Sequence, residues 1–148
     1  MLKYLAFFIC VFPSFSIGQD TVNTSEYLVV LAHKTNTQLR PENIYMLYSM
    51  KQNVMPNQSR AVVVIQNLSS EASIRFFREI FDSFPYQIKR LWDIAVFSGR
   101  AKKPVMKEGN QAVLAYIRQQ ESAVGYVYSK PEHIQFLKEN YHVISIYQ

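Results

Sequence analysis

The alternation of short apolar runs with stretches of helical periodicity most constrains the fold of this chain. The apolar runs are Tyr27–Ala32, Ala61–Ile65, Ala123–Tyr128 and His142–Tyr147. Runs of this length and apolar character are typical of strands that are buried on both faces of a sheet. Because helical patterns lie between them, the chain is predicted to form a mostly parallel sheet covered by helices on both sides. We therefore expect an α/β fold, with a single three-layer domain over residues 19–148.

The helical patterns place apolar residues three and four positions apart. In the segment Glu71–Asp82, a stripe of Ile74, Phe77, Ile80 and Phe81 is predicted to face the core. The other predicted helices start at Arg40-Pro41, after Phe84-Pro85 (with Ile88, Leu91, Trp92 and Ala95 at helical spacing), at Asn110 and at Pro131. The basic segment Arg100–Lys107 between two of these helices is predicted to be a loop, either simply solvated or in contact with a partner.

A hydroxyl-rich turn joins the strand Ala61–Ile65 to the helix that follows it. The first N–H groups of a helix have no internal partner and carry partial positive charge, so this turn could hold an anion. Ser69, Ser70 and Ser73 would add hydroxyl donors, and Arg75 would add a positive charge. Serine is also a favoured helix cap, so the same residues are compatible with a helix that binds nothing.

His33 is a further candidate for ligand binding because it follows the first predicted strand. In open α/β sheets, ligands bind at the carboxyl edge of the parallel strands. If the first strand is parallel to the others, His33 lies at that edge. The alternative is a loop histidine with no ligand.

The N-terminus has the pattern of a secretory signal peptide. Lys3 precedes the apolar run Tyr4–Phe12, and small residues at Ser16 and Gly18 form a cleavage site. We predict a signal peptide over residues 1–18 with cleavage after Gly18, or in second place after Ser16. The alternative is an N-terminal anchor that is retained. Cleavage would remove the single cysteine of the chain, and an exported domain without cysteine fits a bacterial periplasm better than a small secreted eukaryotic domain.

Composition and motif spacing argue against several functional classes. The formal net charge is +5, which suits an anionic ligand or surface but is too small to indicate nucleic-acid binding. The three histidines lie in separate elements without metal-ligand spacing. No nucleophile elbow, phosphate-binding glycine loop or dinucleotide fingerprint is present. We therefore expect no enzymatic activity, no catalytic residues, no metal and no cofactor.

Four stretches, in this order, resemble the phosphate-type periplasmic substrate-binding proteins of ABC transporters, in particular their short single-domain members. They are Leu39–Tyr48, Ala61–Phe77, Leu91-Trp92 followed by Val96-Phe97-Ser98-Gly99, and Ser122–Val127. The resemblance implies one lobe of a type II periplasmic binding protein and a phosphate or similar oxyanion as ligand. It assigns Ser70 to the serine of the family's Ser-Gly-Thr turn, whereas Glu71 and Ala72 replace its glycine and threonine.

Two functional hypotheses follow. The first is an exported, periplasmic substrate-binding-like protein that holds phosphate or another oxyanion at the Ser-rich helix N-terminus. The second is an envelope interaction module on the same fold, with a degenerate ligand site and a protein partner. Because full binding proteins have two lobes and this chain has the length of about one, the first hypothesis includes a possible homodimer that completes the site.

Overall fold

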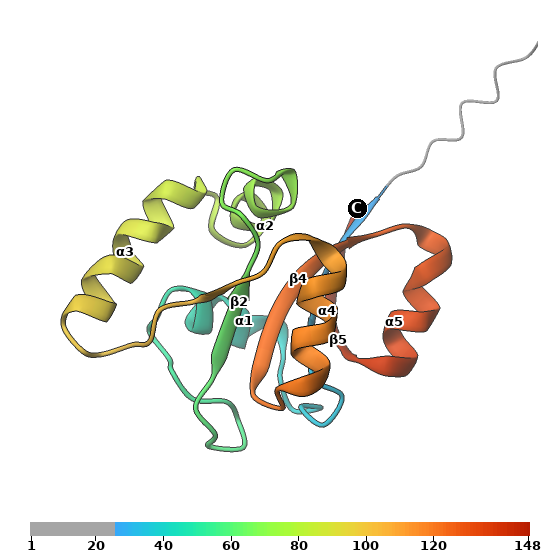
Figure 1. Ribbon diagram of the computed structural model, residues 1–148, viewed down its shortest axis with the longest axis horizontal. Helices are drawn as coiled ribbons and strands as arrows, with labels where there is room; N and C mark the ends of the chain where they lie inside the picture. The colour runs from blue at the N-terminus through green and yellow to red at the C-terminus, as the bar shows by residue number, and fades with distance from the viewer. Residues whose placement is uncertain (1–25) are drawn as a thin grey trace, which may run out of the picture.

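The computed structural model describes residues 26–148 as one α/β domain (Figure 1). The predicted signal peptide, residues 1–18, lies outside the described residues. The elements in chain order are β1 (Tyr27–Ala32), α1 (Pro41–Tyr48), β2 (Val62–Ile65), α2 (Glu71–Phe81), α3 (Pro85–Phe97), β3 (Val105–Met106), α4 (Gly109–Gln119), β4 (Ala123–Ser129), the short 3₁₀ helix η1 (Pro131–His133), α5 (Ile134–Asn140) and β5 (His142–Tyr147).

The five strands form one sheet in the order β3-β2-β4-β1-β5. The strand β2 is parallel to β3 and β4, whereas β1 is antiparallel to both β4 and β5. The prediction of a mostly parallel sheet is therefore confirmed, with β1 as its antiparallel strand. The predicted loop Arg100–Lys107 is corrected in one respect, because Val105 and Met106 pair with β2 as a short edge strand.

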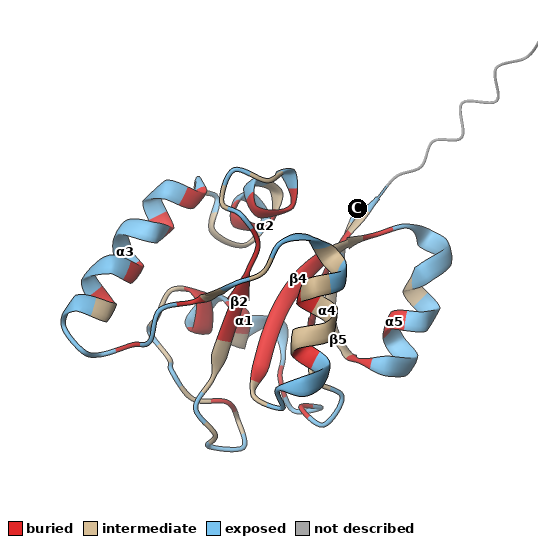
Figure 2. Cartoon of the chain, in the orientation of Figure 1, coloured by how far each residue is buried: buried red, intermediate tan, exposed pale blue. Residues whose placement is uncertain are grey.

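Helices cover both faces of the sheet, which confirms the three layers. Alternate residues of β1 separate into two clusters, as strand geometry requires. Leu28 and Val30 pack with buried residues of α1, α2 and α3, whereas Val29 and Leu31 pack with buried residues of α4 and α5. Figure 2 shows β4 buried along its length, between helices whose outer faces are exposed.

Two predicted core stripes are shifted around their helices. In α2, Phe76 and Phe77 are fully buried, but Ile74 is 37% exposed. In α3, Ile88, Trp92 and Ala95 face the core, whereas Leu91 is 49% exposed. Helical spacing alone is compatible with more than one apolar face of a helix. In α2, the packing of the aromatic rings determines which face is buried, because Phe76 stacks on Tyr126 of β4 with ring centroids 4.1 Å apart.

Among residues 26–148, no helix has both the length and the apolar character needed to cross a membrane.

Candidate functional site

The carboxyl edge of the parallel strands brings two helix N-termini together. The turn after β2 leads into α2, and β3 leads into α4. Gln66, the residue after β2, donates from its side-chain amide to Asn110 Oδ1 of α4 at 3.2 Å and to the carbonyl of Tyr126 at 3.2 Å. Asn110 in turn donates to the carbonyl of Tyr128 at 2.7 Å and accepts the Tyr128 N–H at 3.1 Å. This amide network fixes the starts of α2 and α4 relative to β4.

Ser70 is the N-cap of α2. Its backbone is extended (φ −71°, ψ 150°) and its Oγ accepts the Ser73 N–H at 3.2 Å. The hydroxyl of Ser70 also donates to Ser73 Oγ at 3.2 Å. The cap therefore uses both the donor and one acceptor position of the Ser70 hydroxyl within the helix start.

Ser73 is fully buried, and its hydroxyl faces the core. Ser73 Oγ lies 2.7 Å from the hydroxyl oxygen of Tyr126, which also accepts the Gln66 N–H at 3.2 Å. Burial raises the pKa of Tyr126 to about 12, although its hydrogen bonds with Ser73 and Gln66 act in the opposite direction. Ser73 thus belongs to a neutral, buried network of hydroxyl groups on the core side of the turn between β2 and α2.

The exposed side of the turn is formed by Ser69 and Glu71, whereas Ala72 is buried. Ser69 is exposed, and its N–H donates to Asn67 Oδ1 at 2.9 Å. The N–H groups of Glu71 and Ala72 are the first two of the helix, which a helix leaves without an internal acceptor. The Glu71 side chain is exposed and lines a cavity with Arg75, Arg78 and Glu79 along the outer face of α2. The cavity thus holds two further carboxylates, those of Glu79 and Asp82, as well as two arginines, and the Glu71 carboxylate is open to solvent.

Arg75 does not join Ser69 and Ser70. Its guanidinium donates to the carbonyl of Glu26 at 3.1 Å and to that of Tyr147 at 3.3 Å, and it lies over the ring of Tyr128. These contacts tie together the beginning of β1 and the end of β5. The structure gives Arg75 a role in holding the sheet ends.

His33 lies at the opposite edge of the sheet, which corrects its predicted place. Because β1 runs antiparallel to β4, the residue after β1 sits beside the first residue of β4, and the His33 N–H donates to the carbonyl of Ala123 at 3.4 Å. Its Nδ1 is 2.9 Å from Thr35 Oγ1. The structure therefore separates His33 from the Ser-rich turn.

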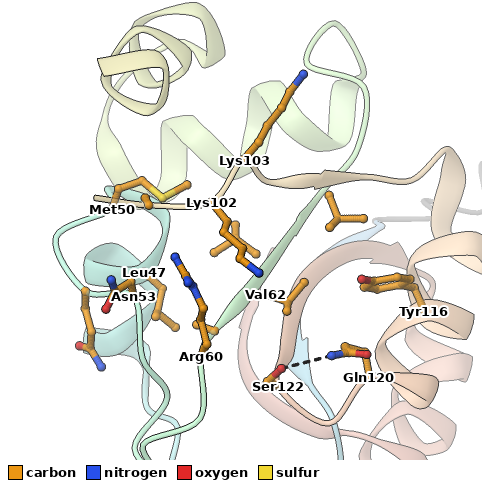
Figure 3. Close-up of a pocket in the computed structure, with 15 residues that line it drawn as sticks. Leu47, Met50, Asn53, Arg60, Val62, Lys102, Lys103, Tyr116, Gln120 and Ser122 are labelled. Carbon is orange, nitrogen blue, oxygen red and sulfur yellow. Dashed lines mark hydrogen bonds between the residues drawn. The ribbon is translucent and has the colours of Figure 1, made fainter. Parts of the chain in front are cut away.

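The structure adds residues that motif reading missed. Gln66 and Asn110 are ordinary polar residues in sequence, and only the adjacency of β2, β3 and β4 makes them partners. Arg60 also has no motif around it in the sequence. It precedes β2 and lines a second cavity with Lys102 and Lys103 of the basic segment (Figure 3). Within residues 26–148, no three His, Cys, Asp or Glu side chains are arranged to hold a metal ion.

Two solved structures of other proteins have a fold similar to that of this chain. No protein-family model matches the sequence, and no curated protein matches it. The fold is similar to that of PstS from Borrelia burgdorferi, with a TM-score of 0.54 and 11% identity over 81% of this chain. It is also similar to an ABC-type phosphate transport receptor from Vibrio cholerae, with a TM-score of 0.50 and 14% identity over 81% of this chain. This chain covers 47% and 46% of those two proteins, so it spans about half their length.

Proposed function

We propose that this protein is a single-lobe, phosphate-type substrate-binding protein that holds phosphate or a similar oxyanion at the N-terminus of α2. The observation that carries the proposal is the carboxyl edge of β2 and β4, where Ser70 caps α2 and the first two N–H groups of the helix have no acceptor within it. The fold it shares with an ABC-type phosphate transport receptor from Vibrio cholerae supports this choice of ligand. The role is binding and not catalysis.

The proposed contacts divide into ligand donors and supports. The N–H groups of Glu71 and Ala72, with the exposed Ser69 hydroxyl, would bind the oxyanion, because helix N-termini combine unpaired donors with a favourable dipole. Ser70 and Ser73 would act indirectly, since their hydroxyls already bond each other and Tyr126. Arg75 and His33 are left out of the contact set, because their contacts lie elsewhere.

A thermal-shift titration with phosphate tests the proposal. At constant ionic strength, phosphate at 100 times its dissociation constant should stabilise the fold by about 2.7 kcal/mol, while sulfate and chloride serve as competing anions. Ser69→Ala should weaken the shift. Ser98→Ala, at the exposed serine that follows the C-terminus of α3, should leave it unchanged. Absence of a saturable shift with phosphate would exclude this ligand.

We also propose that the protein is exported to the periplasm through a signal peptide over residues 1–18. The support is the early lysine, the apolar run Tyr4–Phe12 and the small residues before Gln19. Intact-mass measurement of the protein recovered from the periplasmic fraction should give a chain that begins at Gln19. Retention of the full chain in the cytoplasm would contradict export.

The outer face of α3 favours a second candidate function, an interaction module of the cell envelope. Leu91, Ile94 and Phe97 follow one another at helical spacing and are 49%, 54% and 97% exposed. Phe97 also borders an apolar groove of about 620 Å³ between α3 and β3. Exposed apolar stripes of this kind are typical of protein contacts. Since the chain spans about half the length of its structural neighbours, the partner we propose is a second copy, that is, a homodimer.

A further inference from the structure

A cavity of about 500 Å³ opens at the amino ends of β2 and β4, the edge of the sheet opposite the Ser-rich turn. One wall is the segment Arg60–Val63 that leads into β2, together with the end of α1. The other wall is the end of α4 with Ser122, and the segment Ala101–Lys103 crosses the cavity. Three parts of the chain that are distant in sequence thus converge on one hollow.

The cavity is lined by positive charge without a neutralising carboxylate. Arg60, Lys102 and Lys103 are among its lining residues, and none of the lining residues is acidic. Figure 3 shows the Arg60 guanidinium and the Lys102 ammonium pointing into the same space, while Lys103 points away. In the part of the chain that the structure describes, the one ion pair is Lys89–Asp93, on the surface of α3. Two converging cations that lack a counter-charge would be stabilised by a bound anion.

The remainder of the lining is apolar or neutral. Leu47, Val62 and Val105 form apolar surface, and Tyr116 of α4 points its hydroxyl end toward the cavity. The Lys107 ammonium lies over the Tyr116 ring, 4.6 Å from its centroid. Gln120 and Ser122, hydrogen-bonded to each other at 3.5 Å, add neutral polar groups on the same side. A volume of about 500 Å³ is in the usual range for small-molecule sites, and it is much larger than a bare phosphate needs.

We propose that this cavity is a second ligand site, for a small amphiphilic anion with an acidic head group on an aromatic or apolar body. Arg60 and Lys102 bind the head group as paired cations, and the guanidinium of Arg60 provides a planar donor pair for a phosphate or carboxylate. Tyr116 and the apolar wall contact the body of the ligand. The cationic lining repels ligands that carry a positive head group.

An NMR titration of the purified, ¹⁵N-labelled protein with phenyl phosphate tests this site. Phenyl phosphate should shift the amide signals of Ala61, Val62, Lys102 and Ser122 in a saturable manner. Phenyltrimethylammonium, which has the same aromatic body and the opposite charge, should leave them unchanged. Arg60→Gln or Lys102→Gln should each weaken the binding of phenyl phosphate about tenfold. Arg90→Gln removes an exposed cation of α3 and should have no effect.

The two proposed sites give separate results because they lie at opposite edges of the sheet. Both sites are supported if the two ligands shift different amide signals. Inorganic phosphate should then shift only those of Ser69–Ala72, and phenyl phosphate should shift those of Ala61–Val62 and Ser122. If phenyl phosphate shifts only the amide signals of Ser69–Ala72, the second site is contradicted and the proposed function is unaffected. Binding that survives both Arg60→Gln and Lys102→Gln, or that is equally strong for phenyltrimethylammonium, also overturns the second site.

Discussion

At the scale of single residues, Tyr126 joins a strand, a turn and a helix through one hydroxyl group. Its hydroxyl oxygen is 2.7 Å from Ser73 Oγ and accepts the Gln66 N–H at 3.2 Å. Its ring stacks on Phe76 inside the core. The contacts of Tyr126 therefore fix the start of α2 relative to β4, and with it the direction of the N–H groups that are proposed to bind an oxyanion.

Tyr126→Phe should lower the free energy of unfolding at pH 7 by about 1–3 kcal/mol. The change removes the hydroxyl and leaves two buried groups, the Ser73 hydroxyl and the Gln66 N–H, with fewer partners. Urea denaturation measures the difference. Tyr86→Phe, at a side chain that is 68% exposed, provides the matched control and should leave stability unchanged. Equal stability of Tyr126→Phe and the parent protein would mean that the network contributes nothing.

The same residue predicts a loss of stability in alkali. Burial raises the pKa of Tyr126 from 10 to about 12, so between these pH values the folded protein keeps a proton that the unfolded chain has lost. The contribution is therefore complete below pH 10 and disappears as the pH rises to about 12, a loss of stability on the order of 3 kcal/mol. Urea midpoints measured from pH 9 to 12 should fall less steeply for Tyr126→Phe than for the parent protein. If the urea midpoints of the two proteins fall in parallel with pH, the loss of stability in alkali does not come from Tyr126.

Glu71 should oppose anion binding without preventing it. Its carboxylate begins α2, beside the proposed ligand donors, but it is exposed to solvent, which weakens its repulsion of an anion. Glu71→Gln should therefore tighten phosphate binding by about two- to threefold at low salt. Calorimetric titration measures this, with Glu79→Gln further along the same helix as control. Weaker binding by Glu71→Gln would place the anion elsewhere.

At the scale of elements, Gly125 allows α4 to pack closely on β4. A Cβ atom built at Gly125 would lie 2.9 Å from Ile117 Cδ1 and 3.1 Å from Val113 Cγ1, both on α4. These distances are shorter than normal contacts between carbon atoms. The absence of a side chain at Gly125 thus sets how near α4, whose N-terminus carries Asn110, can approach the sheet.

Gly125→Ala should destabilise the protein by about 1–3 kcal/mol, because the added methyl group overpacks this contact. Ile117→Val removes the atom that the new methyl group would touch first. In a double-mutant cycle followed by thermal denaturation, the pair should therefore be more stable than the sum of the two single changes predicts. If the changes in unfolding free energy of the two single variants simply add in the double variant, the destabilisation by Gly125→Ala does not come from contact with Ile117.

The elements also show what a sequence can and cannot specify. Apolar runs located β1, β2, β4 and β5, because burial on both faces leaves a clear local pattern. The two-residue strand β3 left no such pattern in a basic segment. Periodicity placed Ile74 and Phe77 in the core stripe of α2. Phe77 is buried as predicted, but Phe76 and not Ile74 lies in the core beside it. Local spacing gives a helix and an approximate face, and tertiary packing selects the final orientation.

At the scale of the whole molecule, strand direction decides which candidate residues can act together. The Ser-rich turn follows β2 directly, so its position at the carboxyl edge could be predicted from neighbouring residues. The position of His33 could not, because β1 lies between β4 and β5 and runs against both. The second cavity was beyond sequence reasoning for the same reason, since Arg60 and Lys102 meet only when the sheet is assembled.

The exposed stripe of α3 predicts how whole molecules associate. The side chains of Leu91, Ile94 and Phe97 remain largely in solvent in the monomer, and covering them would remove apolar area from water. Because the stripe is small compared with the area of a stable interface, it should give a weak dimer whose population rises with protein concentration. Sedimentation velocity over a range of concentrations measures this association.

Phe97→Ser should abolish the association, because Phe97 is the most exposed of the three side chains, at 97%. Phe136→Ser is the matched control, since Phe136 is 53% exposed on α5, on the opposite side of the sheet. If Phe136→Ser reduces association as strongly as Phe97→Ser, the effect reflects general surface hydrophobicity and not the α3 stripe. A parent protein that stays monomeric at every concentration would exclude a homodimer through α3, and a partner of different sequence would then be sought for this face.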